Sequence, residues 1–201
     1  MKLLLTNIAV ATLGVTLSQA AIVRWDNTGN LGMGDNLDGI SAPTTVGVPE
    51  ILGLQITIHT ITGMGSGSSL NATSESFGIN SGDSGDNTYR FESAFTESVT
   101  FSFNREVTIT QLDLTHFDGG ESFVFGAQSI VFSDLTNGNT DVFDFSTPLV
   151  IAANTPIAMS ASSGAIGIEA MNITAVPEPS SLALLGLGVL SFTGFRRRSS
   201  C

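Results

Sequence analysis

Apolar and polar side chains alternate along much of the middle of the chain. In the clearest stretch, Val99, Phe101 and Phe103 are separated by Thr100 and Ser102. Because successive side chains of a β-strand point to opposite faces, this alternation predicts strands with one buried face. The strands predicted in this way cover residues 52–58, 98–103, 107–114, 123–125, 130–132, 142–145, 149–152, 157–160 and 166–173.

Two of these strands carry more specific predictions. In the first strand, Leu52 is expected to point to the same face as Leu54 and Ile56. In the third strand, the apolar positions shift by one residue after Ile109. One extra residue in a strand produces such a shift, so we predict a β-bulge near residues 110–111.

Turn-forming residues separate the predicted strands, as at 118–120, 137–139 and 163–164. Residues 21–175 show no sustained helical period. Short strands with turns at intervals of roughly 8–12 residues are typical of antiparallel sandwiches. We therefore predict an all-β fold for residues 21–175, an antiparallel and jelly-roll-like β-sandwich, with Gly/Ser/Asp-rich surface loops at 62–90.

The first twenty residues have the features of a secretory signal peptide in the expected order. Lys2 is basic, residues 3–17 are mainly apolar, and Ser18 and Ala20 are small. We predict a signal peptide over residues 1–20, which signal peptidase cuts between Ala20 and Ala21. The alternative is that this segment forms a buried N-terminal strand or helix.

Charge and cysteine content restrict the partners and the chemistry of the domain. Residues 21–175 contain 17 acidic and three basic residues, which gives a net charge of −14. Phosphate backbones repel such a domain, which excludes nucleic acid as a partner. The single cysteine, Cys201, cannot form an internal disulfide, so core packing must stabilise an exported domain.

The loop-rich segment offers weak candidates for a calcium site. Asn80, Asp83 and Asp86 provide oxygen ligands of the kind that Ca²⁺ prefers. Their spacing does not match an EF-hand, and Asp and Asn are also common in plain turns. We therefore assign no metal ligand and no cofactor, and Ca²⁺ stays open as an alternative.

A short glycine-rich stretch, residues 82–85, resembles the nucleophile motif of chymotrypsin-like serine proteases around Ser84. That chemistry needs a histidine base and an aspartate that orients it. The only upstream histidine, His59, has none of the expected sequence context. We therefore assign no catalytic residue and expect that the protein is not an enzyme.

The end of the chain combines two prolines, an uncharged stretch and three arginines. Residues 182–195 would rise about 21 Å as a helix, which is short for a bilayer core of about 30 Å. Basic residues stay on the cytoplasmic side, so Arg196, Arg197 and Arg198 place the β domain outside. We predict a short transmembrane helix over residues 182–195.

The segment 176–201, with Pro177, Glu178 and Pro179 before the apolar stretch and the arginines, resembles the PEP-CTERM sorting signal of exported bacterial proteins. The resemblance implies that an exosortase, a membrane transpeptidase, recognises these three residues and removes the tail. The arginines would then be the membrane stop. It also implies an exported protein that is first anchored in the inner membrane and then reaches the cell surface or an extracellular matrix, where polysaccharide is a possible partner.

Two functions follow as hypotheses. The first is a non-enzymatic surface or matrix protein that acts by adhesion or structure. The alternative is a calcium-dependent or lectin-like glycan-binding module with the same sorting signal.

Overall fold

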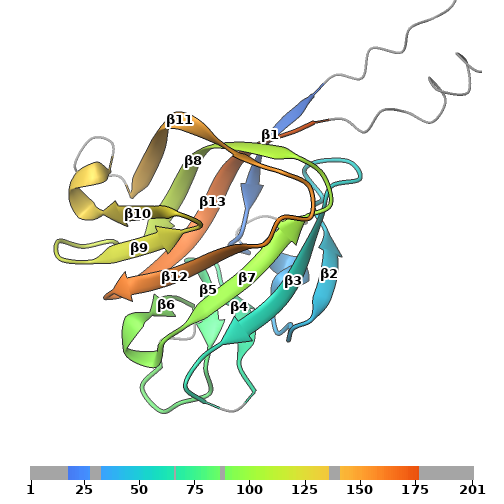
Figure 1. The fold of residues 1–201 in the computed structure, drawn as a ribbon. Coiled ribbons are helices and arrows are strands. Elements are labelled where there is room, and N and C mark those ends of the chain that lie inside the picture. Colours follow the sequence, from blue (N-terminus) through green and yellow to red (C-terminus); the bar gives the residue numbers. More distant parts are fainter. Residues whose placement is uncertain (1–17, 28–32, 66, 87–88, 136–140, 177–201) are drawn as a thin grey trace, which may run out of the picture. The chain divides into compact units, whose positions relative to one another are not determined.

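The computed structural model describes residues 18–27, 33–65, 67–86, 89–135 and 141–176. The compact unit Gln19–Val176 contains two antiparallel β-sheets. Figure 1 shows these sheets as the two layers of a sandwich. The all-β, antiparallel architecture predicted from the alternating pattern is therefore confirmed.

The larger sheet has seven strands and the smaller has six. The seven-stranded sheet consists of β1 (Gln19–Arg24), β4 (Ser69–Ala72), β5 (Phe77–Asn80), β6 (Phe91–Glu92), β8 (Val107–Thr115), β11 (Val142–Ile151) and β13 (Ala165–Ala175). The six-stranded sheet consists of β2 (Thr44–Gly47), β3 (Gln55–Thr62), β7 (Ser98–Phe103), β9 (Ser122–Phe125), β10 (Gln128–Val131) and β12 (Ile157–Ser163). Short helical turns lie at α1 (Met33–Leu37), η1 (Ser93–Phe95) and η2 (Phe132–Asp134).

The strand pairs are nested around the hairpin of β9 and β10. Outward from that hairpin, β8 pairs with β11, β7 pairs with β12, and β13 pairs with β5 and β6. Successive pairs alternate between the two sheets, as in a long hairpin rolled into a sandwich. This arrangement agrees with the jelly-roll-like topology expected from the sequence.

The core between the sheets is built from aromatic and branched aliphatic side chains. Trp25 follows β1 and is fully buried. Its ring lies edge-on to Phe77 of the larger sheet at 5.0 Å and to Phe101 of the smaller sheet at 5.4 Å. Edge-to-face contacts of this kind stabilise aromatic pairs beyond their burial, so Trp25 connects the two layers.

The predicted bulge in β8 is confirmed. Gln111 pairs with Asn172 and Ile109 pairs with the next residue of β13, Ile173. Thr110 is therefore the extra residue in this part of the ladder. It allows the apolar residues on both sides of it to face the same core.

Two predictions about the smaller details of the fold were wrong. Leu52 was expected on a buried strand face, but it lies in the loop before β3 and is 83% exposed. The segment 62–90 was expected to form surface loops, but it contains β4 and β5, with Leu70, Phe77 and Ile79 in the core. Each of these strands has only four residues and lies in a segment rich in Gly, Ser and Asn. Four residues are too few to show a clear alternation of apolar and polar positions.

Among the described residues, no helix has the length and apolar character needed to cross a membrane. The predicted span 182–195 lies outside the described residues.

Candidate functional site

The predicted signal-peptidase site lies in β1. Ala20 pairs with Thr174 and Ala21 pairs with Ile173 of β13. The peptide bond between the two alanines is therefore part of an antiparallel ladder. A cut at this bond would leave the mature chain with Ala21–Arg24 as the rest of the strand, followed by the buried Trp25.

The chain leaves the sandwich next to the predicted sorting motif. The backbone N–H of Val176 donates to the carbonyl of Glu106 at 3.0 Å. Pro177, Glu178 and Pro179, and the three arginines 196–198, lie outside the described residues. In the sequence, only Val176 separates the end of β13, at Ala175, from the first proline of the motif.

The loop that follows β5 is held together by its own polar side chains. One oxygen of Asp86, Oδ2, accepts hydrogen bonds from the Ser81 N–H at 2.6 Å and from the Ser81 hydroxyl at 2.9 Å. Asn80 Oδ1 accepts from the Gly82 N–H at 2.9 Å. Asp83 is exposed in the same turn. The side-chain oxygen of Asn80 is therefore used within the loop, in the bond to Gly82, and is not bonded to Asp86.

A second carboxyl group meets Asp86 beneath this loop. Glu97 precedes β7 and is only 1% exposed, and its Oε2 accepts a hydrogen bond from the Glu92 N–H at 2.8 Å. The other oxygens of the pair, Glu97 Oε1 and Asp86 Oδ1, are buried and accept no hydrogen bond from the described residues. Each carboxyl group therefore has one oxygen fixed by a backbone N–H and one oxygen that lacks such a donor.

The electrostatics of this pair favour a retained proton. Burial raises the pKa of Glu97 to about 8, and the charges of Asp86 and Glu92 act in the same direction. The hydrogen bond from the Glu92 N–H opposes this shift. At neutral pH Glu97 is therefore mostly protonated and can donate toward Asp86.

The same arrangement bears on the calcium alternative. The side chain of Asp86 lies against Glu97. Asp86 meets Asp83 through the backbone, where the Asp86 N–H donates to the Asp83 carbonyl at 3.3 Å, and the exposed Asp83 side chain is not part of the pair. Among the described residues, no group of three or more His, Cys, Asp or Glu side chains is placed to hold a metal ion. Glu97 could have been found from the sequence, because it shares the two-residue phase of the buried Val99 and Phe101.

An acidic group lies at the junction of β1, β8 and β13. Arg24 Nη1 lies 3.1 Å from Glu169 Oε1 and 3.6 Å from Asp26 Oδ2. Burial raises the pKa of Asp113 to about 6, and the charge of Glu169 adds to the shift. Arg24 compensates part of this negative charge, so the group fixes the end of β1 against β13.

His59 and Ser84, the two residues considered for serine-protease chemistry, lie in different settings. His59 Nε2 lies 2.9 Å from the hydroxyl of Ser102 on the neighbouring strand β7. Ser84 is exposed in the loop after β5. The histidine therefore has a serine partner that the sequence motif did not indicate.

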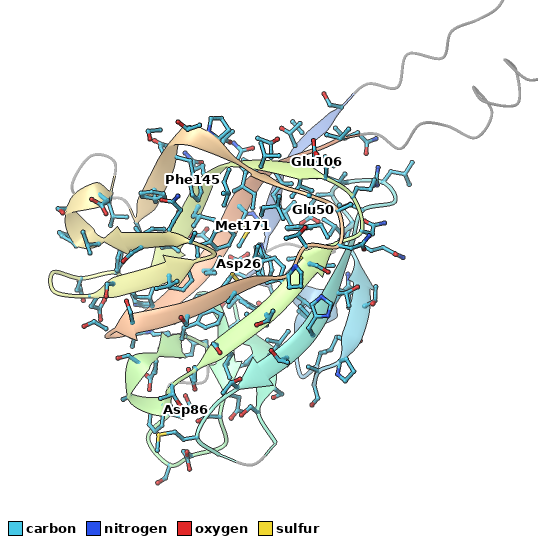
Figure 2. All side chains as sticks on the ribbon, in the orientation of Figure 1. Asp26, Glu50, Asp86, Glu106, Phe145 and Met171 are labelled. Atoms are coloured by element: carbon cyan, nitrogen blue, oxygen red, sulfur yellow. The ribbon has the colours of Figure 1, made fainter. Side chains whose placement is uncertain are left out.

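Figure 2 shows that Asp86 and Glu106 lie at opposite ends of the domain. The carboxyl pair is therefore remote from the end at which the chain leaves β13.

The comparisons with known proteins identify the tail. Residues 175–198 match the family model described as the PEP-CTERM protein-sorting motif. The match contains the three motif residues and the arginines expected from the sequence. Comparisons with curated proteins and with solved structures gave no significant match. The chain therefore carries a PEP-CTERM sorting motif, the signal of exported proteins that are sorted by an exosortase.

Proposed function

We propose that this is a non-enzymatic surface or matrix protein whose β-sandwich is delivered by the tail. The signal peptide would direct export, residues 182–195 would hold the domain on the outer side of the inner membrane, and an exosortase would then remove the tail. The single observation that carries this proposal is the sorting-motif match at residues 175–198, which begins at the last residue of β13.

The distribution of charge supports an adhesive or structural role. The six strands of the smaller sheet contain no Asp, Glu, Lys or Arg, although residues 21–175 have a net charge of −14. Hydroxyl groups pair across this sheet, as in Thr45 with Thr57 at 2.9 Å and Ser122 with Ser162 at 2.6 Å. A neutral, hydroxyl-bearing sheet face fits a neutral polysaccharide of an extracellular matrix.

The sorting step can be tested by replacing Pro177, Glu178 and Pro179 with alanine in the full chain. We expect the native protein in the surface and matrix fractions and the triple variant in the inner-membrane fraction. A control with Pro43→Ala changes a proline of the folded domain and should leave the sorting unchanged. Equal distribution of the native protein and the triple variant would contradict the proposal.

A calcium-dependent glycan-binding module is the second candidate, and the Asp86–Glu97 pair favours it. Apart from the proton that the pair shares, the two buried carboxyl oxygens have no hydrogen-bond donor among the described residues, and Ca²⁺, which prefers oxygen ligands, could displace that proton. Thermal unfolding with Ca²⁺ and with EDTA tests this candidate. Calcium should raise the midpoint of the native protein and leave that of Glu97→Gln unchanged, whereas no effect on the native protein would contradict it.

A further inference from the structure

Exposed apolar side chains gather at the end of the domain where the chain leaves β13. Six large apolar side chains are exposed among the described residues. Four of them define what we call the exit end: Ile22, Leu52, Val150 and Val176. Met64 and Val131 lie elsewhere.

Leu52 and Val176 are held by neighbouring residues of one turn. Arg105 and Glu106 lie between β7 and β8. The Arg105 side chain donates from Nη2 to the carbonyl of Leu52 at 2.5 Å, and the carbonyl of Glu106 accepts from the Val176 N–H at 3.0 Å. The 83% exposed Leu52 is therefore fixed beside the point at which the chain leaves the sandwich.

The other two side chains lie on the outer face of the larger sheet near the same end. Val150 pairs with Thr108 at the beginning of β8 and is 59% exposed. Ile22 pairs with Asn172 in the last part of β13 and is 60% exposed. The exit end therefore carries four exposed apolar side chains beside the exposed Glu106, on a domain that is acidic overall.

The length of chain beyond Val176 limits how far this surface can be from a bilayer. Five residues, 177–181, separate Val176 from the apolar stretch that begins at Leu182. Val176 and Leu182 are six positions apart, and a fully extended chain spans at most about 22 Å over six residues. An inserted tail therefore keeps the exit end within that distance of the hydrocarbon core. The headgroup region on each side is about 5–8 Å deep, so the tether lets the exit end reach the membrane surface, and the exposed apolar side chains must supply the contact itself.

We propose that the exit end docks on the membrane surface while the tail is inserted, so that the sandwich stands on the bilayer with Leu52 and Val176 in the headgroup region. Membrane contact grows with the apolar area that is buried. A few side chains alone bind weakly, but the short tether raises their effective concentration at the bilayer. Docking therefore needs the inserted tail that the proposed function requires.

The loop of Leu52 adds apolar surface for this contact. Leu52 and the half-buried Val46 line a pocket of about 480 Å³ together with Asn36 and Gln55, over the buried Val48 and Leu54. Phospholipid headgroups and the first methylene groups could fill such a pocket. The candidate carboxyl pair at Asp86 lies at the opposite end and would stay in water.

Two labelled variants test the docking. Leu52→Cys and Met64→Cys, each in the full chain with Cys201→Ser, are labelled with an environment-sensitive fluorophore. The labelled chains are reconstituted in phosphatidylcholine vesicles that contain nitroxide-labelled lipid. Leu52 and Met64 form a matched pair because both side chains are exposed. They differ in position, since they lie beyond opposite ends of β3, a strand of about 26 Å.

The label at Leu52 should be quenched by the lipid several-fold more than the label at Met64. A label at Val150→Cys provides the same test if the Leu52 variant does not fold. Flotation with the vesicles but equal quenching at both positions would overturn the docking and leave the proposed function intact.

Two other outcomes would also be decisive. Failure of the full chain to float with the vesicles would contradict insertion of the tail, and with it the docking. Protection of Leu52 that increases with protein density, without quenching by lipid, would assign the exit end to a second copy of the chain and overturn the membrane contact.

Discussion

Ala20 lies opposite Thr174 in the ladder between β1 and β13, although the bond after Ala20 is the predicted signal-peptidase site. The beginning and the end of the folded domain are therefore neighbouring strand segments, as Figure 1 shows for β1 and β13. A peptidase needs an extended substrate that is free of a sheet. Cleavage is therefore expected before β1 docks on β13.

The part of β1 that would remain after cleavage should contribute to stability. Val23 is fully buried, whereas its neighbour Ile22 is 60% exposed. We expect Val23→Ala to lower the free energy of unfolding by about 1.5–3 kcal/mol, since it removes buried apolar surface. Ile22→Ala should change it by less than about 0.5 kcal/mol. Urea unfolding of the two variants checks this, and equal losses would contradict the placement of β1.

The buried carboxyl pair predicts a stability that falls as the pH rises. Folded Glu97 keeps its proton up to a pKa of about 8, whereas in the unfolded chain it releases the proton near 4.3. Between these values the folded state binds more protons, so its stability decreases with pH, by at most about 1.4 kcal/mol per unit. Above pH 8 this contribution levels off.

Glu97→Gln should remove this dependence, because the amide does not titrate. Urea unfolding from pH 5 to pH 9 should therefore show a gain in stability relative to the native protein that grows toward pH 8. Glu75→Gln is the matched control, since the Glu75 side chain is 61% exposed. A native protein and a Glu97→Gln variant with parallel pH profiles would contradict the buried pair.

The backbone of Arg90 lies so close to β5 that position 78 is predicted to require glycine. A Cβ added at Gly78 would collide with the backbone of Arg90, whereas one added at Gly47 in β2 would meet no atom within 4 Å. The N–H of Ile79 donates to the Arg90 carbonyl at 3.0 Å, so the two segments cannot separate without cost. Gly78→Ala should lower stability by roughly 1–3 kcal/mol, as for overpacked cores.

Gly47→Ala should stay within about 0.5 kcal/mol of the native protein. Thermal unfolding of both variants measures the difference. A tolerated alanine at position 78 would show that β5 and the Arg90 segment are not packed as the structure has them.

The sequence predicted those parts of the fold in which alternation was long enough to be unambiguous. The strands around Phe101 and Leu112 and the bulge at Thr110 follow directly from which positions are apolar. Short strands were missed, because four residues such as Phe77–Asn80 cannot distinguish a strand from a loop. Leu52 was misplaced because an apolar residue near a strand fits the alternation even when it points to solvent.

The candidate sites were predictable to different degrees. The sorting motif is local, so its residues were recognisable without any fold. The Asp86–Glu97 pair depends on a contact between a loop and the beginning of β7, and only the inward phase of Glu97 indicated it. The exit end could not be predicted, because its residues are far apart in the sequence and come together only through contacts such as that between Val176 and Glu106.

The intact mass of the protein recovered from the cell surface tests the central claim most directly. We predict a mature chain that begins at Ala21 and lacks the arginines 196–198. A surface or cytosolic product that retains both the uncut leader and the terminal arginines would contradict it.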